Sequence, residues 1–162
     1  MTNQLIQDDI YWMQQALLLA QAAEDLGEVP VGALVVQAGR VLGSGFNQVI
    51  HRSDPSAHAE ILALRGAGAA INNHRLMDTT LYVTLEPCTM CVGAIVHSRI
   101  SRLVFGAAEP KAGAVYSQSA LLDAAYMNWR VAYQGGVCEQ ACSQLLTDFF
   151  ARRRTEIAQA RQ

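Results

Sequence analysis

Long apolar runs are missing from this sequence. The longest one near the N-terminus, from Ala16 to Ala20, is far shorter than the roughly 20 residues that a helix needs to cross a bilayer. The first residues, MTNQLIQDDI, also lack the basic and apolar regions of a secretory signal. We therefore expect a soluble protein that works in the cytoplasm and has no membrane partner.

An excess of positive charge is missing as well. Charged residues make up 16% of the chain and the net charge at pH 7 is -2, which is untypical of a protein that coats nucleic acid. A small, local basic surface is still compatible with this balance. Hydrophobic residues reach 51%, which is typical of a globular protein and excludes a disordered one. The length fits a single domain over residues 1–162, with flexibility expected only at the termini, 1–7 and 158–162.

Apolar periodicity and turn residues divide the chain into alternating helices and strands. Ile10, Met13 and Leu17 lie on one stripe of a first helix, and Gly27 follows its end. The expected elements are a helix over 8–26, hairpin strands over 31–37 and 41–47, a helix over 58–70, a strand over 79–85, a helix over 87–98, a strand over 101–106, a short helix over 118–125, a strand over 130–134 and a helix over 137–158. This order predicts an α/β fold of three layers, in which helices cover both faces of a five-stranded mixed sheet.

Cysteine is scarce, and two of the four cysteines stand in a pattern typical of metal ligands. Cys88 and Cys91 are three residues apart after Pro87, so on a helix that begins at Pro87 they share a face. The first turn of a helix also stabilises thiolates. His58, at the start of another expected helix, supplies a third ligand. Three protein ligands leave one position of a tetrahedral site open for water, which is typical of catalytic zinc.

Glu60 lies two residues after His58 and is expected to meet the metal-bound water without ligating the metal, as a general acid and base. Each feature alone has an ordinary explanation. A pair of cysteines with this spacing also occurs in redox sites and zinc fingers, and a lone histidine or glutamate at a helix start is usually a cap or a surface residue. The combination of His58-x-Glu60 with Pro87-Cys88-x-x-Cys91 is far more specific.

The combined pattern resembles the cytidine deaminase superfamily. Within it, the sequence is similar to the bacterial tRNA-specific adenosine deaminases from about residue 8 to 157. The stretches that carry this resemblance are 28–33 (EVPVGA), 54–60 (DPSAHAE), 81–88 (LYVTLEPC), 97–100 (HSRI), 104–107 (VFGA) and 148–152 (DFFAR). The resemblance implies a cytidine deaminase-like fold, one zinc ion per subunit and a homodimer. The implied reaction is hydrolysis of the wobble adenosine in a tRNA anticodon to inosine, with release of ammonia.

The resemblance also assigns substrate-binding roles at matching positions. Asn47 would hydrogen-bond the extruded nucleoside, with a turn residue after a strand as the alternative. The backbone amide of Ala59 would recognise the base. Pro30, Val31 and Leu85 would line an apolar slot around the purine, although each could equally be an ordinary core residue.

Aromatic and basic side chains stand together near the C-terminus. Phe149 and Phe150 precede Arg152, Arg153 and Arg154, and such a group offers ring planes for bases and positive charge for phosphates. A solvated helix end with its aromatics in the core is the alternative, and one of the phenylalanines is expected to pack. From this group we expect Phe149 and the three arginines to contact the RNA.

The loop over 107–116 matches the family only in part, with Glu109 where an aspartate is typical and Tyr116 where a small residue is common. In the family this loop lies near the bound RNA, so Glu109 and Lys111 are further expected contacts. How strictly the nucleotides beside the target are read, and which tRNA is edited, stays open.

Two other functions also stay open from the sequence. A deaminase of free guanine, cytosine or cytidine would share the zinc site but would not need the Phe- and Arg-rich helix. A non-catalytic zinc module that binds RNA would close the fourth metal position with a protein ligand. Cys138 and Cys142, four residues apart, are more typical of buried apolar cysteines than of a second metal pair.

Overall fold

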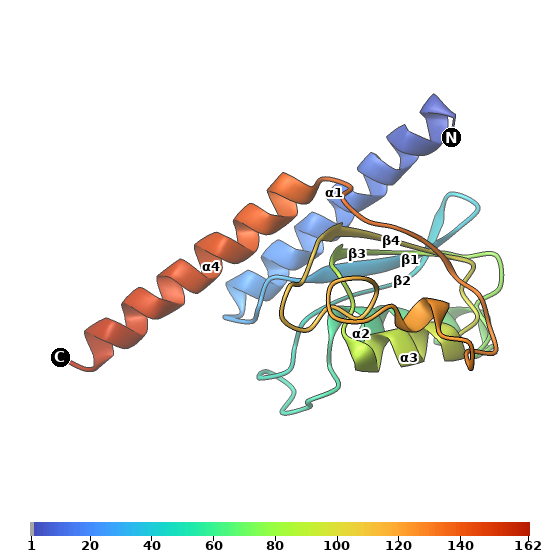
Figure 1. The fold of residues 1–162 in the computed structure, drawn as a ribbon. Coiled ribbons are helices and arrows are strands. Elements are labelled where there is room, and N and C mark those ends of the chain that lie inside the picture. The colour runs from blue at the N-terminus through green and yellow to red at the C-terminus, as the bar shows by residue number, and fades with distance from the viewer. Residues whose placement is uncertain (1) are drawn as a thin grey trace.

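The computed structural model describes residues 2–162, which form one five-stranded mixed sheet with helices on both faces (Figure 1). In chain order the elements are α1 (Asn3–Asp25), β1 (Gly32–Gln37), β2 (Arg40–Phe46), α2 (Ala59–Ile71), β3 (Thr80–Leu85), α3 (Thr89–His97), β4 (Arg102–Ala107), the 3-10 helix η1 (Leu121–Asp123), β5 (Ala132–Gln134) and α4 (Glu139–Ala160). The strands lie in the order β2-β1-β3-β4-β5. β1 is antiparallel to β2 and β3, whereas β3, β4 and β5 are parallel. The predicted three-layer α/β fold is confirmed.

Each face of the sheet carries its own pair of helices. Figure 1 shows α1 and α4 on one face and α2 and α3 on the other. Along β1, Ala33 and Val35 pack in the cluster that contains α2 and α3, while Leu34 and Val36 pack in the cluster that contains α1. Because both faces are covered, the central strands are almost continuously apolar instead of alternating with polar residues.

Two helix starts differ from the expected positions. α1 begins at Asn3, five residues earlier than expected, and the hydroxyl of Thr2 caps it by accepting the N–H of Leu5 at 3.4 Å. α3 begins at Thr89 with Cys88 as its N-cap, so Pro87 lies just before the cap and not at the first helical position. This shift moves Cys88 out of the first turn and onto the cap.

The expected elements near the C-terminal half are shorter than predicted. The helix expected over 118–125 is the single 3-10 turn of η1, and the strand expected over 130–134 keeps three residues in β5. At the chain ends, residues 3–7 and 158–160 are helical, and Met1 lies outside the described residues. Within residues 2–162, no helix combines the length and the apolar character that a membrane span requires.

Close packing of α2 on β2 positions the N-terminus of that helix. A Cβ atom on Gly43 would overlap backbone atoms of Ala63 and Ala67 in α2, so only glycine permits this approach. α2 therefore lies directly against the sheet.

A buried ionic network fixes α1 on the opposite face. Asp9 is 1% exposed, and its carboxylate accepts two hydrogen bonds of 2.7 Å from Arg102 and one of 2.8 Å from the hydroxyl of Tyr82. A buried carboxylate is costly unless donors of this kind satisfy it. The network joins α1 to β3 and β4 on the face away from α2 and α3.

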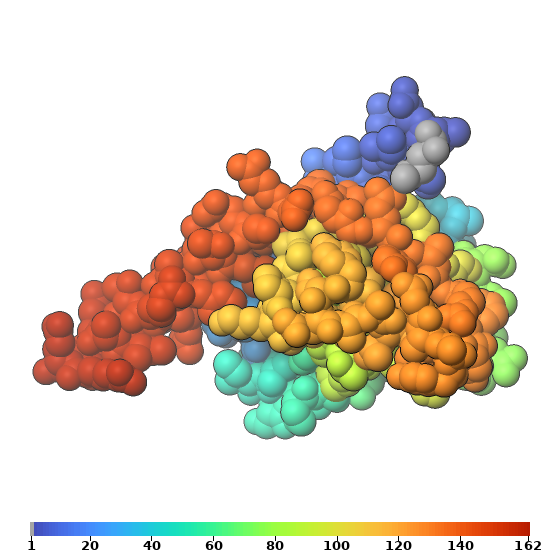
Figure 2. Space-filling model, viewed as in Figure 1, coloured from blue at the N-terminus to red at the C-terminus, as the bar shows by residue number. Residues whose placement is uncertain are grey.

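α4 is only loosely covered by the rest of the protein. Its buried residues are Cys142 and Phe149, both in the first half of the helix. The second half extends beyond the sheet, and Figures 1 and 2 show it projecting from the body of the molecule. Its far end is therefore free on most sides.

Candidate active site

Three side chains from two helix starts converge on one point. His58 is the N-cap of α2, Cys88 is the N-cap of α3, and Cys91 follows within the first turn of α3. An N-cap side chain usually accepts a hydrogen bond from the first turn of its helix, but those of His58 and Cys88 make no such bond. Both side chains are therefore available to bind a common ligand.

The distances in this group suit a metal ion. The ligand atoms of His58, Cys88 and Cys91 all lie within 4.8 Å of one another. Nδ1 of His58 is 3.7 Å from Sγ of Cys88 and 3.5 Å from Sγ of Cys91. Within residues 2–162 no other group of His, Cys, Asp and Glu side chains has such a geometry. The structure thus brings together the three residues that the sequence predicts as metal ligands.

The surroundings of Cys88 favour a thiolate. Hydrogen bonds from the Cys91 thiol, from His58 and from the Cys91 backbone outweigh burial and lower the pKa of Cys88 to about 3. The hydrogen bond between the two cysteines also raises the pKa of Cys91, so without a metal the pair shares one proton. Metals bind the thiolate form, and a bound ion replaces that proton.

Glu60 lies beside the metal-binding group without belonging to it. It is the second residue of α2, its side chain is 4% exposed, and it lines the same cavity as His58 and Cys88. Burial raises the pKa of its carboxyl to about 7, which suits a group that takes up and releases a proton near neutral pH. The position is the one that the sequence predicts for a proton shuttle.

A cavity of about 340 Å³ opens onto this group, a volume within the usual range of small-molecule sites. Val31 and Leu85 line it as expected, whereas Pro30 is buried and does not line it. The sequence reading missed the other lining residues, which are the apolar Val29, Val49, Ile50 and Ala112 and the acidic Glu28 and Glu86. One feature of the sequence could have pointed to this wall, namely the apolar Ile50 in a loop that is otherwise mostly polar. In the structure, 69% of its surface is exposed.

Asn47 lines the cavity and holds the start of α2. Its side-chain oxygen accepts the backbone N–H of Ala59 at 2.9 Å, and the backbone N–H of Asn47 donates to the carbonyl of Val31 at 3.1 Å. The expected recognition of a base by the Ala59 amide is therefore revised, because that N–H already has a partner in the protein and Ala59 is fully buried. The amide nitrogen of Asn47 is the group of this pair that remains to donate to a ligand.

Known proteins are similar to this chain in sequence and in fold. Residues 7–154 match the MafB19-like deaminase family. A tRNA-specific adenosine deaminase from Haemophilus influenzae is 54% identical over 145 residues, which cover 89% of this chain and 84% of that protein. One from Bacillus subtilis is 39% identical over 158 residues, 98% of each chain. The chain belongs to the tRNA-specific adenosine deaminase family.

Solved structures of deaminases are similar to this family member. A structure from work on A-to-I editing by tRNA:A34 deaminases at the wobble position of transfer RNA has a TM-score of 0.82 and 40% identity, over 84% of this chain and 99% of that one. A guanine deaminase from Nitrosomonas europaea has a TM-score of 0.72 and 27% identity, over 86% of this chain and 82% of that one. This tRNA-specific adenosine deaminase family member is thus an enzyme, and the editing deaminase is the nearer of these two structures.

The aromatic pair of this family member divides between the core and the surface. Phe149 is 5% exposed and packs edge-on against Phe150, with 5.4 Å between the ring centroids, whereas Phe150 is 44% exposed. The expected RNA contact of Phe149 is therefore wrong, because its ring is inside the protein. Phe150 is the ring that faces outward.

The basic side chains that the sequence predicts as RNA contacts also differ in what they contact. Arg152 pairs with Glu24 of α1, and Arg153 lies 3.4 Å from Glu156. Arg154 lines a second cavity of about 430 Å³ together with Phe150 and Glu109, and this cavity shares Val29, Leu85 and Glu109 with the first one. Lys111 is exposed and lines neither cavity. The second cavity thus continues the first one toward α4.

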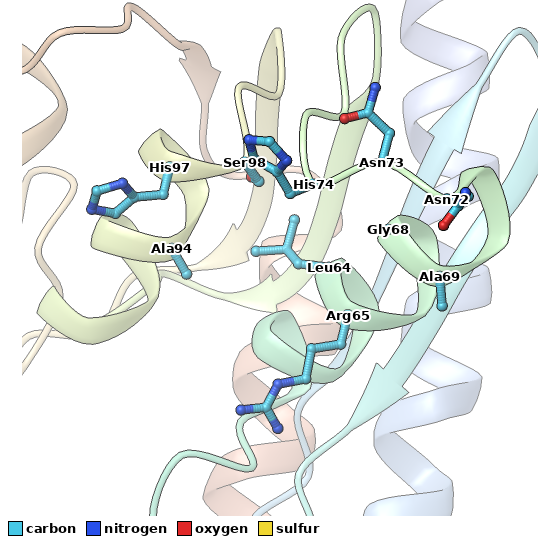
Figure 3. Close-up of a pocket in the computed structure, with 10 residues that line it drawn as sticks. All are labelled: Leu64, Arg65, Gly68, Ala69, Asn72, Asn73, His74, Ala94, His97 and Ser98. Carbon is cyan, nitrogen blue, oxygen red and sulfur yellow. The ribbon is translucent and has the colours of Figure 1, made fainter.

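A larger cavity lies away from this site. It has a volume of about 680 Å³ and is lined by Leu64, Arg65, Gly68 and Ala69 of α2, Asn72, Asn73 and His74 after it, Ala94 and His97 of α3, and Ser98 (Figure 3). Two histidines are among the lining residues, but no cysteine or carboxylate accompanies them. The chemistry of the lining residues, and not the volume, therefore locates the active site.

Proposed function

We propose that this protein hydrolyses the wobble adenosine of a tRNA anticodon to inosine and releases ammonia, with zinc as its metal. The observation that carries this proposal is the group of His58, Cys88 and Cys91 with Glu60 beside it, in a chain of the tRNA-specific adenosine deaminase family. The apolar side chains and the Asn47 amide around a cavity of about 340 Å³ suit a single extruded base.

The donor set and the spacing both support zinc. Zinc binds cysteine sulfur at about 2.3 Å and histidine nitrogen at about 2.0–2.1 Å in tetrahedral geometry, which places N and S ligands about 3.5 Å apart. The distances from His58 Nδ1 to the two sulfurs, 3.7 and 3.5 Å, agree with this value. A zinc ion held by these three residues would supply a nucleophile at neutral pH by acidifying a water molecule.

The side chains around the metal group perform the remaining steps. Glu60 accepts a proton from the attacking water and transfers it to N1 of the purine. It then takes the proton of the new hydroxyl on C6 and delivers it to the amino group, which leaves as ammonia. Asn47 donates its side-chain amide to the nucleoside and keeps the first turn of α2 in place through Ala59. Val31 and Leu85 contact the faces of the base and exclude bulk water from the reacting atoms.

The residues that line the second cavity support the proposal of an RNA substrate. Phe150 and Arg154 combine an outward-facing ring with a positive charge beside the catalytic cavity, which suits a base and a phosphate next to the target nucleotide. A local contact of this kind needs no overall positive charge, in agreement with the net charge of -2. We also propose a homodimer in the cytoplasm, where tRNA is found, and sedimentation velocity of the purified protein tests the dimer.

The experiment that tests this function compares substrates directly. Purified protein is incubated with anticodon stem-loops that carry adenosine at the wobble position, and with free adenosine, guanine, cytosine and cytidine. Mass spectrometry of the RNA is expected to show a gain of one inosine at the wobble position and little conversion of the free compounds. Faster turnover of guanine than of RNA would replace this proposal with a guanine deaminase.

Replacing each phenylalanine of α4 with alanine is expected to affect a different property, substrate binding for Phe150 and stability for Phe149. The Phe150→Ala variant loses an exposed stacking surface, and its KM for the anticodon stem-loop should rise roughly 10-fold, since stacking of a base on a ring contributes about 1–3 kcal/mol. The Phe149→Ala variant should keep the KM of the wild type but lose about 3–5 kcal/mol of unfolding free energy. Steady-state kinetics and thermal unfolding measure the two effects, and a KM effect confined to Phe149→Ala would contradict the assignment.

A further inference from the structure

A buried carboxylate lies between β3 and the metal ligands and is used by none of the steps above. Glu86 follows the last residue of β3 and precedes Pro87 and Cys88, and its side chain is only 2% exposed. Its backbone N–H donates to the carbonyl of Ala107 at the end of β4, at 2.8 Å. The backbone of Glu86 is therefore held in the same framework as the metal site.

The carboxylate is surrounded by donors from a single loop. Oε2 of Glu86 accepts the backbone N–H groups of Val115, Tyr116 and Ser117 at 3.1, 3.0 and 3.0 Å. Oε1 accepts the N–H of Glu109 at 3.2 Å and the hydroxyl of Ser117. Residues 108–117, which we name the rim loop, are thus wrapped around one negative charge.

The shape of the rim loop depends on this carboxylate. A Cβ atom on Gly113 would overlap the carboxylate of Glu86, so the loop passes directly over it. One further hydrogen bond, from the N–H of Ala114 to the carbonyl of Pro87 at 2.9 Å, joins the loop to the segment before Cys88. Most of the polar contacts that hold the two ends of the loop together therefore meet at Glu86.

The rim loop forms walls of both cavities. Glu109 and Ala112 line the catalytic cavity, and Ala108, Glu109 and Pro110 line the second cavity next to α4. A displacement of this loop changes the space for the target base and for its neighbour at the same time.

We propose that Glu86 is a positioning residue that holds the rim loop and thereby sets how the nucleotides around the target adenosine bind. This inference rests on the proposed function for its RNA substrate, but its structural part does not. If Glu86 is replaced by glutamine, one of its two acceptor oxygens becomes a donor that faces other donors, and part of the rim loop loses its acceptor. The metal ligands keep their own contacts, because none of the loop donors belongs to them.

The first measurement needs no substrate. In hydrogen–deuterium exchange, the amides of Val115, Tyr116 and Ser117 are expected to exchange at least about 10-fold faster in Glu86→Gln than in the wild type. The matched control is Asp9→Asn, which alters a carboxylate as deeply buried as Glu86 and also held by hydrogen bonds, but on the α1 face of the sheet. The control should lower overall stability without selectively exposing those three amides. Unchanged exchange in Glu86→Gln would overturn the proposal whatever the substrate is.

The second measurement separates positioning from catalysis. Glu86→Gln should keep its metal content and show a KM for the anticodon stem-loop about 10-fold higher or more, with kcat changed much less. It should also discriminate less between stem-loops that differ only in the nucleotides beside the target, whereas Asp9→Asn should keep the wild-type KM and discrimination. A fall in kcat alone, or loss of the metal, would overturn the proposal by assigning Glu86 to the chemical step or to the metal site.

A milder variant covers the case in which Glu86→Gln does not fold. Ser117→Ala removes one donor and leaves the carboxylate in place. It should shift the exchange of the rim loop and the KM in the same direction by a smaller factor, and a wild-type result in both would overturn the proposal.

Discussion

A Glu60→Ala variant is expected to bind its metal like the wild type and to lose most of its deaminase turnover, by a factor on the order of 10²–10⁴. Glu60 lines the catalytic cavity next to His58 and Cys88, but it contributes no atom to the group of metal ligands. Its removal therefore takes away the proton acceptor and donor while the ligand set stays complete. Inosine formation on an anticodon stem-loop and zinc content after dialysis measure the two quantities separately.

Two further variants show whether the loss of turnover comes from the lost proton transfer or from the lost negative charge. Glu60→Gln keeps the size of the side chain and should be almost as inactive as the alanine variant, since an amide does not take up the proton. Glu109→Gln removes another negative charge from the wall of the same cavity and should keep most of the turnover. Near-normal activity of Glu60→Gln would exclude Glu60 as the proton shuttle, and equal losses in both glutamine variants would favour a general charge effect.

The fold and the metal-binding group were accessible from the sequence because local rules determine them. The central strands are apolar runs bounded by turn residues, and the helices between them follow a simple apolar periodicity, so the three-layer architecture could be predicted. His58 and Cys88 each stand at a helix start, where a side chain that does not cap the helix can point toward a ligand. That placement depends on a few neighbouring residues and is therefore visible in their spacing.

The roles of residues that depend on tertiary contacts could not be predicted from the local sequence. The sequence offers two adjacent phenylalanines and does not distinguish Phe149, which packs inside, from Phe150, which faces outward. The backbone amide of Ala59 is engaged only because Asn47, twelve residues earlier, folds back onto it. In the sequence, Glu86 is a single acidic residue after a strand. The hydrogen-bond donors to its carboxylate come from residues 23 to 31 positions later. Long-range contacts of this kind leave no periodic pattern in the sequence.

Loss of one metal ligand is expected to remove both the metal and the activity. The Cys91→Ala variant keeps only His58 and Cys88 as protein ligands, and two ligands do not hold zinc tightly in competition with water. We expect less than about one tenth of the wild-type zinc content after dialysis and no measurable inosine formation. In thermal unfolding, added zinc should stabilise the metal-free wild-type protein by roughly 4 kcal/mol at a concentration 1,000 times its Kd, and it should stabilise the variant much less.

The chain contains a matched control for this experiment. Cys138 is a half-buried cysteine at the N-cap of α4, and with Cys142 it forms the other pair of cysteines in the sequence. The two pairs differ in that only Cys88 and Cys91 have a histidine at ligand distance. Cys138→Ala should therefore keep the full zinc content and turnover of the wild type. If this control also lost zinc, the metal would bind at the second pair, and if Cys91→Ala kept both its zinc and its turnover, the catalytic site would not be the one built from α2 and α3.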